Sequence, residues 1–244
     1  MKIDIPVSQP YRVDIAPGLL DDLGRYVSSG TAALVAPLLL ERACRALRAA
    51  GVRAVPAILP AGEETKSLAQ YAALLHKLAE AGLTRADTVV ALGGGVIGDL
   101  AGFAAATWLR GIRLVQVPTT LLAIVDSSVG GKTAIDLPEG KNLVGAFYPP
   151  RLVLIDPNVL ASLPDSTFAD GMAEVVKYGY ISNRKILTMV SQPDYKANIE
   201  NIIYECVKIK RDVVAIDEHD TGLRMILNFG HTIGHAAEKL GNYT

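Results

Sequence analysis

Two histidines one helical turn apart, His231 and His235, are the clearest candidates for chemistry in the sequence. With Arg224 and Asn228 they have spacings of 4, 3 and 4 residues, so a continuous helix would carry all four on one face. Paired imidazoles can share a metal ion, or one can bind the metal while the other transfers protons. The same spacing occurs in solvated surface helices, and the poor helix formers Asn228 and Gly230 favour a helix that starts only near His231.

Lysine and glutamate side chains stand at helical spacing in two other segments. Lys210 continues an apolar stripe from Ile203 to Val213, where a lysine either extends to solvent or meets an anion in the interior. Glu174 and Lys177 lie three residues apart in a second helix-like segment, which by itself favours a surface ion pair. The spacings alone leave both alternatives open.

A glycine-rich loop, Leu92–Asp99, follows a predicted strand and precedes a helix predicted to begin near Val96. Such a loop lets the backbone approach a phosphate, and the free amides of the helix start favour one. Its G-x-G-x-x-G pattern departs from the dinucleotide fingerprint, because the next strand ends in Gln116–Pro118 without an acid for the ribose. Gly131–Thr133 resembles the end of a P-loop, but Asp126 replaces the required glycine, which argues against an ordinary phosphate-loop NTPase.

The elements that must position these residues alternate in the first part of the chain, as in a layered α/β domain. The strand candidates are Met1–Ile5, Tyr11–Ile15, Ala32–Ala36, Ala54–Leu59, Thr88–Leu92, Leu114–Val117 and Val153–Ile155. The clearest helical pattern is Leu68–Ala81, and Gly130–Pro150 is predicted to be a loop or hairpin.

The pattern becomes helical after Asp156. The predicted helices there are Phe168–Tyr178, Ile199–Asp217 and His231–Leu240. We therefore predict one domain over residues 1–155 and a second, helical domain over residues 156–244.

Composition excludes several classes of function. The 244 residues carry 24 basic and 25 acidic side chains, so the net charge of −1 provides no general attraction to nucleic acid or to an anionic membrane. No apolar run approaches the ~18 residues of a membrane span, and the amino terminus lacks a signal-peptide core. The two cysteines, Cys44 and Cys206, form no metal-binding motif, which indicates a reduced, cytoplasmic protein.

Six strings together resemble the 3-dehydroquinate synthase family in order and spacing. They are Gly93–Asp99, Val117–Leu122, Val125–Thr133, Gly140–Leu143, Gly171–Lys177 and Asn228–His235. The resemblance implies an α/β fold with a Rossmann-like NAD-binding domain followed by an α-helical domain for metal and substrate. It also implies that NAD and a divalent metal, zinc or cobalt, convert 3-deoxy-D-arabino-heptulosonate 7-phosphate to 3-dehydroquinate and phosphate in a homodimer.

The resemblance also assigns roles by motif. The implied metal ligands are Glu174 and His231, and the implied proton-transfer group is His235. The implied substrate contacts are Asp126, Lys132, Asn142, Lys177, Lys210, Arg224 and Asn228, with Arg110 reaching the phosphate from a partner subunit. The implied NAD contacts are Glu63, Lys66, Gly94, Gly95, Val96, Asp99, Thr119 and Thr120.

Two features depart from the family pattern. Val35–Pro37 occupies the place of the acid or amide that holds the adenosine ribose, and the sequence ends at Thr244, before the family's third metal ligand and a further lysine. From this we expect an incomplete helical domain with weak metal binding. The alternatives are an inactive fragment that keeps NAD binding, and another sugar-phosphate cyclase, whose substrate lacks the carboxylate that Arg224 and Asn228 would bind. An iron-type polyol dehydrogenase shares the architecture but would not need Lys132 and Asn142.

Overall fold

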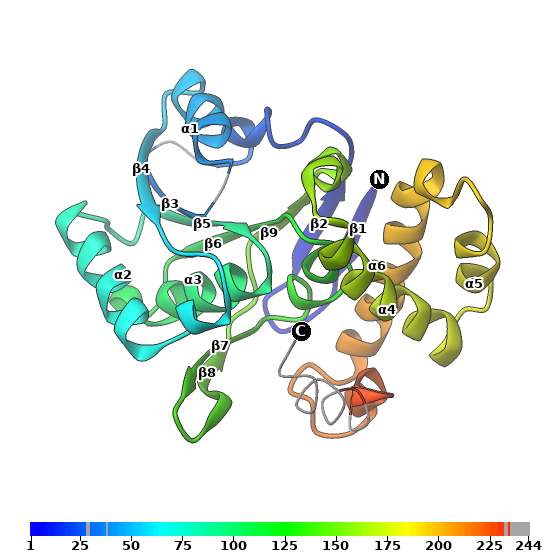
Figure 1. Cartoon of the computed structure of the whole chain (residues 1–244). Coiled ribbons are helices and arrows are strands. Elements are labelled where there is room, and N and C mark those ends of the chain that lie inside the picture. The colour runs from blue at the N-terminus through cyan, green and yellow to red at the C-terminus, as the bar shows by residue number, and fades with distance from the viewer. Residues whose placement is uncertain (28–29, 38, 232–233, 235–244) are drawn as a thin grey trace.

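A seven-stranded sheet forms the centre of the computed structural model, which describes residues 1–27, 30–37, 39–231 and 234 (Figure 1). Its strand order is β1-β2-β9-β6-β5-β3-β4, and every neighbouring pair is parallel except β1 with β2. The strands are β1 (Lys2–Ile5), β2 (Tyr11–Ile15), β3 (Thr31–Ala36), β4 (Arg53–Ile58), β5 (Thr88–Gly93), β6 (Arg113–Pro118) and β9 (Leu152–Ile155).

Helices cover both faces of this sheet, because alternate side chains of each central strand are apolar. In β3, Leu34 packs in one apolar cluster with α1 (Leu40–Ala49), whereas Val35 packs in a second cluster with α2 (Leu68–Glu80) and α3 (Gly95–Thr107). A parallel sheet buried on both faces is typical of α/β domains. The α/β prediction is confirmed.

A β-hairpin and a group of helices complete the fold. The hairpin pairs β7 (Lys132–Leu137) with β8 (Gly140–Phe147) and projects beyond the sheet (Figure 1). After β9, the longer helices are α4 (Asp165–Ile181), α5 (Lys185–Val190) and α6 (Ile199–Ile216), followed by the 3₁₀ helix Leu223–Asn228. None of the helices in the described part is long and apolar enough to cross a membrane.

The predicted strands and the hairpin agree with the structure, with strand ends within one residue. The predicted helix Leu68–Ala81 ends at Glu80, and Gly82 follows with a φ of +69°, the left-handed conformation that commonly stops a helix. Residues between Asp156 and His231 form helices and connecting segments only. The division into domains 1–155 and 156–244 stays a prediction.

A break in the helix separates Arg224 from His231, as the poor helix formers Asn228 and Gly230 indicate. Arg224 and His231 do not share a continuous helix, because the 3₁₀ helix ends at Asn228, Phe229 has an extended ψ of 124° and Gly230 has a φ of +84°. These torsions break the helical rise between the two residues. His235, and the predicted helix His231–Leu240 except His231 and Gly234, lie outside the described residues.

Candidate functional site

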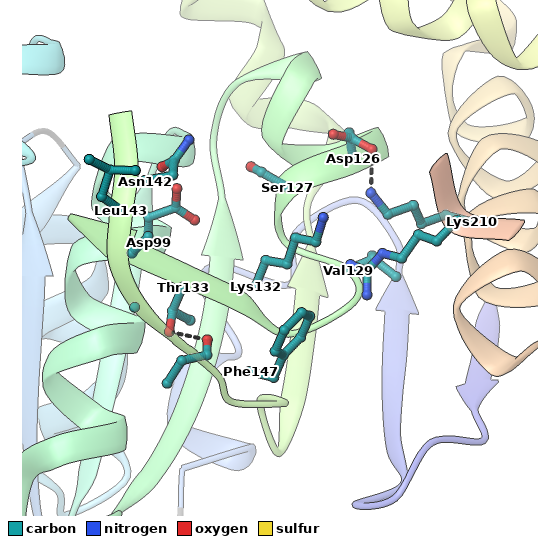
Figure 2. Close-up of a pocket in the computed structure, with 14 residues that line it drawn as sticks. Asp99, Asp126, Ser127, Val129, Lys132, Thr133, Asn142, Leu143, Phe147 and Lys210 are labelled. Atoms are coloured by element: carbon teal, nitrogen blue, oxygen red, sulfur yellow. Dashed lines mark hydrogen bonds and ion pairs between the residues drawn. The ribbon is translucent and has the colours of Figure 1, made fainter. Parts of the chain in front are cut away.

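A cavity of about 520 Å³ is lined in part by residues of the segments that follow the parallel strands β5 and β6, namely Asp99, Asp126 and Ser127 (Figure 2). Its polar lining includes six of the predicted site residues: Asp99, Asp126, Lys132, Asn142, Lys210 and Arg224. They come from α3, the segment Ala123–Ser127, the hairpin, α6 and the 3₁₀ helix that follows α6. The carboxyl ends of parallel strands are where α/β folds usually bind ligands.

The Asp126 carboxylate is the centre of the charged cluster on one side of the cavity. Lys210 is buried and forms an ion pair with it, so this lysine meets an interior anion instead of extending to solvent (Figure 2). The Tyr178 hydroxyl donates to Asp126 Oδ1 at 3.0 Å. Burial alone would raise the pKa of Asp126, but the ammonium groups of Lys210 and Lys177 outweigh it and lower the pKa to about 2.

This lowered pKa predicts a loss of stability in acid. Because the folded pKa of Asp126 is below the usual 3.8, its stabilisation is complete above pH 3.8 and disappears as the pH falls towards 2. We expect the free energy of unfolding to fall by about 2 kcal/mol over this window through Asp126. Burial lowers the pKa of Lys210, so part of the gain at neutral pH is offset. Urea unfolding between pH 5 and pH 2 should show this loss, and Asp126→Asn should lack it; parallel curves would contradict the assignment.

Glu174, Lys177 and His231 form a second cluster, outside the lining of the cavity. Lys177 is buried, forms an ion pair with Glu174 and donates to the Leu227 carbonyl at 2.6 Å, so the two residues form an interior pair and the surface alternative does not hold. His231 Nε2 lies 3.3 Å from Glu174 Oε1. No group of three potential metal-ligating side chains occurs within the described residues. The two predicted ligands are nevertheless neighbours.

Arg224 and Asn228 differ in their surroundings. Arg224 is buried and lines the cavity, and its guanidinium donates to the carbonyls of Glu218 and Gly130 at 2.6 and 3.0 Å. Asn228 is exposed and does not line the cavity, because the 3₁₀ geometry directs residues four apart to different faces. The structure therefore brings Arg224 to the charged cluster without Asn228.

Lys132 lies between the two sides of the cavity (Figure 2). Its ammonium forms an ion pair with Asp220. On the opposite side, Lys66 Nζ donates to Asp99 at 2.7 Å and to the Asn142 side chain. Burial raises the pKa of Asp99 to about 6, although Lys66 opposes the rise. Lys66 thus joins a predicted NAD contact to a predicted substrate contact.

The glycine loop packs closely against its neighbours. A Cβ at Gly94 would lie 3.0 Å from Thr120 Cγ2, and a Cβ at Gly95 would lie 3.0 Å from Ser127 Oγ. Gly94 makes no side-chain cap at the start of α3, so amides around Val96 at that end remain for a ligand. Thr119 joins the same loop through its amide, which donates to the Gly93 carbonyl at 2.9 Å.

Glu63 and Arg110 also lie outside the lining of this cavity. Glu63 lines a separate cavity of about 1040 Å³ beside the start of α2, together with Lys66. Arg110 is exposed after α3, with a φ of +67°, and is not part of the cavity lining. Its contact with a partner subunit stays a prediction.

The predictions missed three residues of the cluster. Tyr178 holds Asp126, Asp220 pairs with Lys132, and Phe147 lines the cavity beside Lys132. Tyr178 directly follows the matched string that ends at Lys177, so the buried face of its helix could have suggested it. Asp220 and Phe147 show no periodicity that would separate them from ordinary loop and strand residues.

Comparison with known proteins gives one consistent family. Family models for 3-dehydroquinate synthase match the chain, the N-terminal one at residues 56–170 and the C-terminal one at residues 171–244. A 3-dehydroquinate synthase of Clostridium perfringens (strain 13 / Type A) is 56% identical over 186 residues, 75% of this chain and 53% of the relative. That of Clostridium kluyveri is 46% identical over 255 residues, 99% of this chain and 71% of the relative. The chain thus spans about half the length of the first of these relatives.

Two solved structures share the fold closely. The crystal structure of 2-deoxy-scyllo-inosose synthase complexed with carbaglucose-6-phosphate, NAD+ and Co2+ has a TM-score of 0.89 at 29% identity, covering 98% of this chain and 69% of that chain. ValA, the 2-epi-5-epi-valiolone synthase from Streptomyces hygroscopicus subsp. jinggangensis 5008 with NAD+ and Zn2+ bound, has a TM-score of 0.82 at 26% identity, covering 91% and 66%. Both of these structures hold NAD+ together with a divalent metal ion.

Proposed function

The chain belongs to the 3-dehydroquinate synthase family, and we propose that it carries out the family's reaction. In this reaction 3-deoxy-D-arabino-heptulosonate 7-phosphate loses phosphate and closes to 3-dehydroquinate. A transient oxidation acidifies a C–H bond, phosphate leaves, and reduction with aldol closure completes the ring. The observation that carries the proposal is one cavity that holds Asp126, Lys132, Lys210 and Arg224 beside the glycine loop.

The chemistry of the cavity suits an acidic sugar phosphate. Lys132 and Asn142 line one part and would bind the phosphate, while Arg224 would bind the carboxylate. Lys210 and Asp126 form an ion pair whose carboxylate accepts from Tyr178, so both charges are oriented before substrate arrives. Asp220 would leave Lys132 when phosphate takes its place.

NAD fits the glycine loop, because the start of α3 has no side-chain cap and its amides can bind the pyrophosphate. Gly94 and Gly95 let the loop pack closely against Thr120 and Ser127, and both glycines and Thr120 would contact the cofactor. Lys66 and Asp99, which form an ion pair, together with Glu63, Val96 and Thr119, would bind the same cofactor. A metal fits Glu174 and His231, because ligands of one tetrahedral zinc ion lie roughly 3.3 Å apart, the separation seen here. When bound, NAD supplies a hydride acceptor and zinc or cobalt supplies a Lewis acid at the substrate oxygen.

Residues of the second cluster would take part in the same site. Lys177 forms an ion pair with Glu174 and lowers the pKa of Asp126, so its ammonium would be close enough to the charged cluster to orient a substrate oxygen. We also propose that His235 transfers protons and that Asn228 joins Arg224 at the carboxylate after a local rearrangement. A cytoplasmic homodimer, with Arg110 reaching the partner's phosphate site, completes the proposal.

Phosphate release tests the proposal directly. The chain is incubated with NAD and zinc or cobalt, and inorganic phosphate and 3-dehydroquinate are measured from 3-deoxy-D-arabino-heptulosonate 7-phosphate. Glucose 6-phosphate, which has no carboxylate, serves as the comparison substrate. Turnover of the acidic substrate alone is expected. Turnover of glucose 6-phosphate instead would favour another sugar-phosphate cyclase, and NAD binding without release from either would favour a non-catalytic NAD-binding protein.

Gly95→Val should weaken NAD binding. The Cβ position already lies 3.0 Å from Ser127 Oγ, so two further methyl groups would crowd the loop where the pyrophosphate would lie. We expect the dissociation constant for NAD, measured by calorimetry, to rise at least about tenfold, since displacing the loop costs on the order of 1–3 kcal/mol. Circular dichroism should show that the variant is folded. Unchanged affinity in a folded variant would mean that the loop is only a structural turn.

A further inference from the structure

The guanidinium of Arg224 is seated between two backbone carbonyls. Nη1 donates to the Glu218 carbonyl at 2.6 Å, and Nη2 donates to the Gly130 carbonyl at 3.0 Å. Both acceptors are neutral, so they fix the direction of the guanidinium without neutralising its charge. A guanidinium has five N–H donors, and within the described part of the chain these two bonds leave others for a ligand.

The lack of a side chain at Gly130 lets its carbonyl come close to the Arg224 guanidinium. Its φ is +106°, and a Cβ at this position would lie 2.3 Å from Arg224 Nη2. The guanidinium therefore occupies space that any side chain at residue 130 would fill. A shift of the Gly130 backbone would move the carbonyl that orients Arg224.

Tyr11 fixes the same residue, Gly130, through its amide N–H. It stands at the start of β2 with 5% of its surface exposed, and its hydroxyl accepts the Gly130 N–H at 2.9 Å. Strand β2 pairs with β1 and β9, so the ring is fixed by the sheet. Two hydrogen bonds, from Gly130 to Tyr11 and from Arg224 to Gly130, thus link the sheet to the charged cavity.

We propose that Tyr11 is a positioning residue that, through Gly130, fixes the guanidinium of Arg224 for the substrate carboxylate. The inference rests on the proposed function, because it takes Arg224 as the carboxylate-binding residue. Burial raises the pKa of Tyr11 to about 12, so near neutral pH the hydroxyl adds no negative charge that would compete for the guanidinium.

The backbone of Arg224 is anchored independently of Tyr11. Asp217 accepts from the amides of Thr221, Gly222 and Arg224 at 2.9, 2.7 and 3.0 Å. Removal of the Tyr11 hydroxyl therefore leaves the start of the 3₁₀ helix in place and frees only the guanidinium end. The effect should appear in carboxylate recognition, whereas a purely structural role would change only stability.

Tyr11→Phe removes the hydroxyl and keeps the ring. With 3-deoxy-D-arabino-heptulosonate 7-phosphate, we expect KM to rise about three- to tenfold, the size of one neutral hydrogen bond, with kcat nearly unchanged. With an analogue that lacks the carboxylate, the same variant should bind like the unmodified chain in calorimetry. Tyr148→Phe is the matched control, because its hydroxyl likewise bonds to the backbone, donating to the Ile112 carbonyl at 2.6 Å, outside the cavity lining.

Arg224→Leu separates this inference from the proposed function. If Arg224→Leu loses the preference for the carboxylate while Tyr11→Phe keeps it in full, the role of Tyr11 is overturned and the proposed function stands. If Arg224→Leu also keeps the preference, Arg224 does not bind the carboxylate and both ideas fail. A rise in KM for Tyr148→Phe equal to that for Tyr11→Phe would likewise overturn positioning, because it would show a general effect of lost buried hydroxyls.

Discussion

Arg224→Leu should lower kcat/KM for 3-deoxy-D-arabino-heptulosonate 7-phosphate by about 30- to 1,000-fold. Loss of a buried, charge-assisted contact to a carboxylate costs on the order of 2–4 kcal/mol, and each 1.4 kcal/mol changes the rate about tenfold. The guanidinium is buried and lines the cavity, so solvent cannot replace it. Steady-state kinetics with NAD and metal at saturation measure the change.

An analogue of the substrate serves as the control for this prediction. The loss should nearly vanish with an analogue that lacks the carboxylate, because the substitution would then remove no contact in the transition state. Arg42→Leu is the matched variant. Arg42 lies on α1, outside the cavity lining, and forms a bidentate ion pair with Asp21 at 2.6 and 2.7 Å. Equal losses on both substrates would mean that Arg224 acts on the fold and not on the carboxylate.

The sequence predicted the sheet well because local signals and long-range packing agree there. Strands such as Thr88–Gly93 are continuous apolar runs between turn residues, which is what a sheet covered on both faces requires. The glycines of the loop after this strand, and Gly82 after α2, likewise have a local conformational cause. Such features can be predicted from the local sequence, without knowledge of the residues that pack against them.

The charged cluster could not be predicted in the same way. Lys210 and Asp126 are 84 residues apart, and Tyr11 and Gly130 are 119 apart, so their contacts depend on how α6 and the sheet meet. Spacing left Lys210 undecided between solvent and an interior anion. It would place Asn228 beside Arg224 on an α-helix, but the two residues lie in a 3₁₀ helix, which directs residues four apart to different faces. Motif resemblance selected six of the eight polar residues that line the cavity, whereas their partners Tyr178 and Asp220 belonged to no matched string.

Lys210→Met should remove most activity and also destabilise the chain. Lys210 and Asp126 are both largely buried, with side-chain exposures of 7% and 25%, so loss of the lysine leaves a carboxylate without its main partner. Removal of one member of a buried pair costs about 3–5 kcal/mol, and the partial exposure of Asp126 places the expected loss nearer ~2–3 kcal/mol. The positive charge of Lys177 still stabilises the Asp126 carboxylate and limits the loss of stability. Lys208→Met, an exposed lysine on the same helix, is the control.

The double variant Asp126→Asn with Lys210→Met separates stability from chemistry. Because it removes both charges, it should regain at least about half of the stability lost in Lys210→Met, while kcat/KM stays at least about 100-fold below that of the unmodified chain. Urea unfolding at pH 7 gives the first quantity and phosphate release gives the second. If the double variant recovered activity together with stability, the pair would serve the fold alone. If Lys210→Met lost no more stability than Lys208→Met, the Asp126 carboxylate would not depend on Lys210, and the electrostatic account of the cavity would be wrong.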